Sequence, residues 1–140
     1  MPEQPYSYTD PQARRLTLRT ATDLSDRPYV WLEAEKLTGR TVTVTSVWLR
    51  PEQAVTLRKH LSAGARYETL DHTGDKLLVR AGAETVVEVT RRPVSGEASA
   101  TVRVSVPSHR LSELRAAVAA TAEQAQRRDA ARAQQGGAQS

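Results

Sequence analysis

The sequence predicts an α+β fold in which antiparallel β-sheets of about seven strands are covered by two helices. Two joins between a strand and a helix support this prediction. In the first, the alternating polar and β-branched residues of Thr41–Thr45 lead through Leu49 to Pro51, and leucines then recur at helical spacing. In the second, the alternation of Thr101–Val106 leads through Pro107 into another helical pattern. The whole order is therefore strands, helix, strands, helix.

The composition restricts the class of protein. The chain has 140 residues, the size of one ordinary domain, and no cysteine. It therefore has no disulfide, thiol nucleophile or cysteine-based zinc site. No apolar run approaches the roughly 20 residues that a transmembrane helix needs. The start, Met1–Pro5, has neither the basic beginning nor the apolar middle of a signal peptide. We therefore expect a soluble cytoplasmic protein.

The first half of the chain contains three predicted strands and a helix. Residues 1–13 are polar and rich in proline, which predicts a flexible N-terminal tail. Alternating polar and apolar residues then predict strands over residues 14–21, 29–37 and 41–49. A Thr-Gly turn joins the last two strands into a hairpin. Leu57 and Leu61 follow at helical spacing, and Gly64 stands where a helix C-cap would.

The second half contains four predicted strands and a second helix. The strands cover residues 66–70, 76–81, 85–91 and 98–106. The helix begins near Ser108, a favourable N-cap residue, and its apolar stripe ends at Val118. Beyond Val118, Ala, Gln and Arg favour a helix but offer nothing to bury, and we expect fraying past about Gln126. We therefore predict a single folded domain over residues 14–126 and a disordered C-terminal tail over residues 127–140.

The similar order of the two halves suggests a possible internal duplication. When Val42 and Val44 are overlaid on Val102 and Val104, the spacing from strand to helix slips by about one residue. Such a slip would move side chains to the opposite face of a sheet. The predicted core residues are Leu57, Leu61, Leu111, Leu114, Val42, Val44, Val102, Val104 and Val106.

No residue pattern in the sequence indicates catalysis or metal binding. His60, His72 and His109 are far apart, and none has a partner three or four residues away on a helix. Asp71 lies in a turn-forming segment, where an Asx-type turn explains it. The seven glycines occur singly, with no phosphate-binding loop. We predict that the protein is not an enzyme and uses no cofactor or metal.

Arginines on the polar faces of the predicted strands carry the best indication of function. The 20 basic and 16 acidic residues give a net charge of +4, which permits a polyanionic partner without requiring one. Proteins that bind single-stranded nucleic acid combine a basic groove with aromatic side chains on which bases stack. The predicted nucleic-acid-binding residues are Arg15, Arg19, Tyr29, Trp31, Arg40, Arg80 and Arg103.

The predicted order, strand-rich halves that each end in a helix, resembles the arrangement of the coactivator-type and Whirly-type single-strand DNA-binding folds. This resemblance implies DNA binding, but it carries over no residues, because the sequence contains none of the motifs of either family. A second hypothesis is a dimeric accessory or adaptor protein that acts through protein contacts. It stays open because glutamates on neighbouring strands would pair with the arginines across the sheet, namely Glu33, Glu35, Glu84 and Glu88. Under both hypotheses, unpaired edge strands favour a homodimer.

Overall fold

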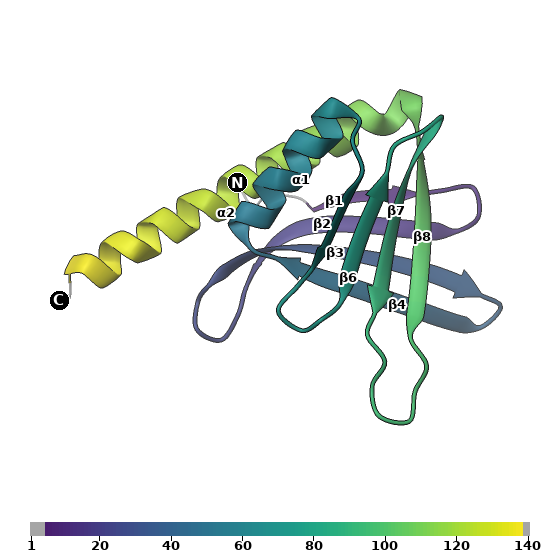
Figure 1. Cartoon of the computed structure of the whole chain (residues 1–140), viewed down its shortest axis with the longest axis horizontal. Coiled ribbons are helices and arrows are strands. Elements are labelled where there is room, and N and C mark those ends of the chain that lie inside the picture. Colours follow the sequence, from purple (N-terminus) through teal and green to yellow (C-terminus); the bar gives the residue numbers. More distant parts are fainter. Residues whose placement is uncertain (1–4, 139–140) are drawn as a thin grey trace.

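The chain folds into two four-stranded antiparallel sheets, each followed by a helix, which confirms the predicted α+β class (Figure 1). The computed structural model describes the backbone of residues 5–138 and the side chains of residues 5–134. Sheet A has the order β1-β2-β3-β4 and consists of β1 (Tyr6–Thr9), β2 (Arg14–Thr22), β3 (Pro28–Thr38) and β4 (Thr41–Leu49). Sheet B has the order β5-β6-β7-β8 and consists of β5 (Tyr67–Leu70), β6 (Lys76–Arg80), β7 (Glu84–Arg91) and β8 (Ala100–Pro107). The helices are α1 (Pro51–Ala63), the short 3-10 helix η1 (Ser108–Arg110) and α2 (Leu111–Ala138).

The two sheets pack against each other through one face each. In Figure 1 the strands of sheet A run across the view, the strands of sheet B cross them steeply, and α1 and α2 lie side by side along one end. A single buried cluster joins both sheets and both helices, and its members include Leu16, Leu32, Val47, Leu57, Leu77, Val89, Val104 and Leu114. Because the inner faces share this core, the outer faces of the two sheets point away from each other.

The join from β4 into α1 follows local chemistry that the sequence predicts. Pro51 occupies the first position of the helix, where its missing N–H costs nothing. The Gln53 side chain accepts a hydrogen bond from the Arg50 N–H at 2.9 Å and so satisfies a donor at the helix start. Gly64 ends the helix in the left-handed region at φ 66°, and its N–H donates to the Leu61 carbonyl at 3.3 Å. The predicted C-cap is thus confirmed.

The predicted inward orientation of Val42 and Val44 is wrong. Their side chains are 52% and 39% exposed, because the pairing of β3 with β4 turns the odd-numbered residues of β4 inward and the even-numbered residues outward. Val47, which lies opposite Leu32, is fully buried instead. Leu111 is only partly buried against the core. The remaining predicted core residues are buried, namely Leu57, Leu61, Leu114, Val102, Val104 and Val106.

The structure adds regular elements at both ends of the chain. Tyr6–Thr9, inside the predicted N-terminal tail, pairs with β2 as an eighth strand. Helix α2 continues through Ala138, across most of the tail predicted as disordered, and its side chains from residue 126 to 134 are exposed. The helix propensity of Ala, Gln and Arg extends a helix that packing has already started. Residues 1–4 and 139–140, which belong to the predicted tails, lie outside the described residues. None of the described helices is long and apolar enough to cross a membrane.

Candidate nucleic-acid interface

The outer face of sheet A carries both tryptophans side by side. Trp31 of β3 lies directly opposite Arg19 of β2 on one side and Trp48 of β4 on the other. Directly opposed residues project from the same face of a sheet, so these side chains form one row across three strands. The Arg19 guanidinium carbon lies 4.1 Å from the centroid of the Trp31 ring, in cation–π contact. We call Arg19, Trp31 and Trp48 the aromatic row.

Tyr29 supports the aromatic row from a buried position. Its side chain is only 6% exposed, and its ring meets the Trp48 ring edge-on with a centroid distance of 5.5 Å. The His72 ring lies 5.4 Å from the Tyr29 ring. The sequence predicts Tyr29 as a stacking platform, but the structure encloses this ring. Its geometry instead holds Trp48 in a defined orientation.

Asp71 fixes the backbone of Trp48. This carboxylate is 7% exposed, and its Oδ2 accepts a hydrogen bond from the Trp48 N–H at 2.9 Å. Its Oδ1 accepts from the N–H groups of Thr73 at 2.9 Å and Asp75 at 3.0 Å, which confirms the predicted Asx-type turn. The turn between β5 and β6 is thereby tied to the free edge of β4, and the row is ordered before any ligand arrives.

Arginines and glutamates alternate beside the aromatic row on β2 and β3. Arg15 pairs with Glu35, with a distance of 3.0 Å between Nη2 and Oε1. Burial raises the pKa of the Glu33 carboxyl above its ordinary value, and Glu35 adds to this effect, while Arg15 and Arg19 oppose it. The outer face of sheet A therefore carries two arginines and two carboxyl groups.

A second group of arginines lies beside Tyr29, which precedes Trp31 by two residues on β3. Arg27, Arg50 and Arg132 line a cavity of about 160 Å³ together with Tyr29, Pro28, Pro51, Glu52 and Asp129. Glu52 lies 3.3 Å from the Arg50 Nε. The sequence gives no signal for this group, since its members come from a loop, a strand–helix join and the predicted tail. Only the fold brings them together, and we call them the arginine cluster.

The structure divides the seven predicted binding residues between separate surfaces. Arg15, Arg19 and Trp31 share the outer face of sheet A. Arg40 is exposed in the turn between β3 and β4. Arg80 and Arg103 instead lie on the outer face of sheet B, where both form ion pairs with Oε1 of Glu88. One carboxylate there offsets one of the two positive charges, and both arginines face away from the tryptophans.

The fold is shared with two solved plant proteins. WHY3 from Arabidopsis thaliana superimposes with a TM-score of 0.60 at 10% sequence identity, over 86% of this chain and 86% of that chain. The plant transcriptional regulator PBF-2 also superimposes with a TM-score of 0.60, at 13% identity, over 87% of this chain and 82% of that chain. No family model matches the sequence, and no curated protein matches it either. The similarity is thus one of fold, over nearly the whole of each chain.

Proposed function

We propose that this chain is a non-enzymatic module that binds single-stranded nucleic acid, DNA in the first instance, on the outer face of sheet A. The observation that carries this proposal is the aromatic row, whose two tryptophans are partly exposed on the face of sheet A that does not form the shared core. Neighbouring strands are about 4.8 Å apart, so two adjacent indoles can offer stacking surfaces to neighbouring bases. The similarity of fold to a plant transcriptional regulator supports a nucleic-acid partner.

Arginines on both sides of the row offer hydrogen-bond donors to phosphates. Arg15 lies on one side along the strands, and the arginine cluster lies on the other, beyond Tyr29. A single strand that stacks its bases on the indoles would bring its backbone near both groups. Phosphate contacts of this kind position a strand without selecting its sequence. We therefore expect little preference for base sequence at this face.

The direct test is a fluorescence titration of the protein with a single-stranded oligonucleotide at several salt concentrations. We expect quenching of the tryptophan fluorescence. If the protein contacts three or four phosphates, each should add about 0.7 to the slope of log affinity against log salt concentration, and the affinity should fall by about 20-fold to 50-fold between 50 and 200 mM salt. The same sequence as a duplex should bind more weakly, since its bases are unavailable for stacking. Equal binding of duplex and single strand would contradict the proposal.

Glu33 is expected to oppose binding, and its replacement by glutamine should strengthen it. Above its raised pKa the carboxyl is ionised and repels phosphate, and as the pH falls through that pKa the repulsion is lost. Glu33→Gln should therefore tighten binding at pH 7 by up to about fivefold, the equivalent of about 1 kcal/mol. The parent chain should gain affinity as the pH is lowered from 7 to 5, and Glu33→Gln should make this gain smaller.

A matched control variant removes one negative charge from the outer face of sheet B instead of sheet A. Glu68 lies on the outer face of sheet B, where it pairs with Lys76 at 2.9 Å. Glu68→Gln changes the net charge by the same amount but should leave the pH dependence intact. If both variants gain affinity equally, the effect is one of total charge, and Glu33 has no local role.

An apolar surface at the end of the β3–β4 hairpin favours the second candidate function, a self-associating adaptor. Leu37 and Val42 lie opposite each other and are both 52% exposed, and Val44 beside them is 39% exposed. A homodimer would remove this surface from water at about 25 cal/mol per Å² of apolar area. Light scattering at tens of micromolar protein measures the oligomeric state directly, and a monomer would count against the adaptor hypothesis.

A further inference from the structure

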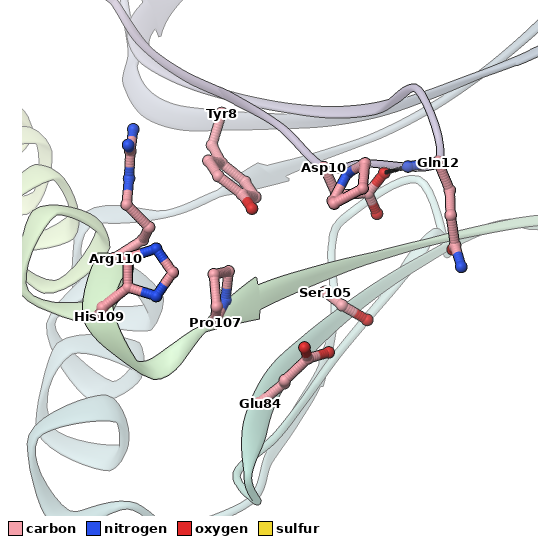
Figure 2. A pocket seen from close by; sticks show the side chains of 9 residues that line it. Tyr8, Asp10, Gln12, Glu84, Ser105, Pro107, His109 and Arg110 are labelled. Atoms are coloured by element: carbon pink, nitrogen blue, oxygen red, sulfur yellow. Dashed lines mark hydrogen bonds between the residues drawn. The ribbon is translucent and has the colours of Figure 1, made fainter.

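A cavity of about 410 Å³ opens between the edges of the two sheets, on the opposite face of sheet A from the aromatic row (Figure 2). Tyr8 of β1 projects from the same face of sheet A as the buried Leu16, which lies opposite it on β2. The other walls come from the turn after β1, the start of β7, the end of β8 and η1. The lining residues are Tyr8, Asp10, Pro11, Gln12, Glu84, Ser105, Pro107, His109 and Arg110.

The two ends of this cavity differ in chemistry. Figure 2 shows His109 and Arg110 toward one end and Asp10 and Gln12 toward the other, with Tyr8 and Pro107 between them. The Arg110 guanidinium carbon lies 5.5 Å from the centroid of the Tyr8 ring. Arg110 also contacts Glu113, with 3.1 Å between Nε and Oε2. One end therefore carries the Arg110 guanidinium and the His109 imidazole, and the other carries hydrogen-bond acceptors.

Asp10 holds one carboxylate oxygen ready for a ligand. The residue is 5% exposed, and its Oδ1 accepts hydrogen bonds from the N–H groups of Gln12 at 2.9 Å and Arg14 at 3.0 Å. Within the residues that the structure describes, Oδ2 has no hydrogen-bond partner, and Figure 2 shows the second oxygen directed toward the cavity. Oδ2 of Asp10 can therefore accept a hydrogen bond from a ligand that enters the cavity. The exposed Glu84 carboxylate lines the same cavity.

We propose that this cavity binds one nucleotide. Its base lies between Tyr8 and Pro107, its phosphate lies toward His109 and Arg110, and the amino edge of the base donates to Asp10 and Glu84. The volume falls within the range of about 300–1,000 Å³ that is usual for small-ligand sites. Guanine, adenine and cytosine carry an exocyclic amino group, whereas thymine offers carbonyl acceptors at the same positions. The site therefore prefers guanine, which has two kinds of donor on one edge, over thymine.

A free mononucleotide and one nucleotide of a bound strand present the same chemistry to this cavity. The strand-borne form rests on the proposed function of sheet A, and the free form does not. The outer face of sheet A binds without regard to sequence, whereas this cavity discriminates among bases. The two sites are therefore separable by base preference and by the residues on which each depends.

The test is a titration of the full chain with 2′-deoxyguanosine monophosphate and, separately, thymidine monophosphate, followed by amide NMR shifts. We expect saturable shifts at Tyr8, Gln12 and Ser105 with the guanine nucleotide. Asp10→Asn should weaken guanine binding by about tenfold or more, because a charge-assisted hydrogen bond is lost and a donor replaces an acceptor. The asparagine retains an oxygen for the turn, so the fold is kept. The same variant should narrow or reverse the preference over thymidine.

Two further variants and one oligonucleotide pair complete the experiment. Tyr8→Leu should weaken both nucleotides, and Arg58→Gln, which removes an exposed arginine of α1, should change neither. An oligothymidine with one internal guanine should bind more tightly than oligothymidine alone if the strand reaches the cavity, and equally if the ligand is a free nucleotide. The shifts at Tyr8, Gln12 and Ser105 report on the cavity and not on the aromatic row. Absence of saturable shifts at the cavity residues, or an Asp10→Asn variant with unaltered base preference, would overturn the proposal.

Discussion

Replacement of Trp31 by alanine is expected to weaken the binding of a single-stranded oligonucleotide by about fivefold to a hundredfold, because a stacked base contributes about 1–3 kcal/mol. Trp31 is the centre of the aromatic row, with Arg19 on one side and Trp48 on the other. Its loss removes one stacking surface and also the ring that holds the Arg19 guanidinium in place. Anisotropy of a labelled oligonucleotide at fixed salt measures the change.

The controls separate stacking from charge. Trp31→Phe retains an aromatic face and should recover part of the affinity. Trp31→Ala should leave the salt slope unchanged, whereas Arg15→Gln should lower the slope by about 0.7 if it removes one phosphate contact. Suppose instead that Trp31→Ala binds like the parent chain and that truncation before residue 127 abolishes binding. The arginines of the α2 extension would then account for the binding, and sheet A would have no role.

The periodicity of the sequence predicts most elements because local chemistry decides them. The join at Pro51 and the C-cap at Gly64 depend on a fixed φ and on a left-handed conformation, both local properties. The register of β4 is different, since both of its faces contain apolar residues. Pairing with β3 decides it: Glu35 must face water, and Val44 lies opposite this residue. Thr45 then points inward and donates its hydroxyl to the Ala34 carbonyl at 3.3 Å.

The slip between the two halves of the sequence corresponds to this change of face. Val44 points outward in sheet A, whereas Val102 and Val104 point inward in sheet B. A shift by one residue in a strand has this effect, because successive side chains alternate between faces. Each half nevertheless contains four strands followed by a helix. A possible duplication stays a hypothesis, but the offset that the sequence shows is real in the structure.

The candidate site was only partly predictable because it depends on which strands share a sheet. Arg19 and Trp31 come from consecutive, adjacent strands of one sheet, so the order of the strands in the sequence is enough to predict that the two residues are neighbours. Arg103 has the same alternating pattern, but it belongs to the other sheet and pairs with Glu88 at 2.6 Å. The arginine cluster adds Arg132 from 82 positions beyond Arg50, a separation over which no local pattern operates.

Leu49→Ala is expected to lower the free energy of unfolding by about 2–5 kcal/mol, and it tests the register of β4. Leu49 is fully buried, and it points inward only in the register that turns Val44 outward. The alanine would leave a cavity between sheet A and the rest of the core, which surrounding side chains fill only in part. Urea denaturation followed by circular dichroism measures the change.

Leu37→Ala is the matched control, because it deletes the same atoms from the neighbouring strand. Leu37 is 52% exposed on β3, so its replacement should change the free energy of unfolding by about 0.5 kcal/mol or less. A register shifted by one residue would turn Leu49 outward and Val44 inward. In that case Leu49→Ala would be nearly neutral and Val44→Ala costly. The shift would also carry Trp48 into the core and dismantle the aromatic row, so this stability measurement bears on the binding surface as well.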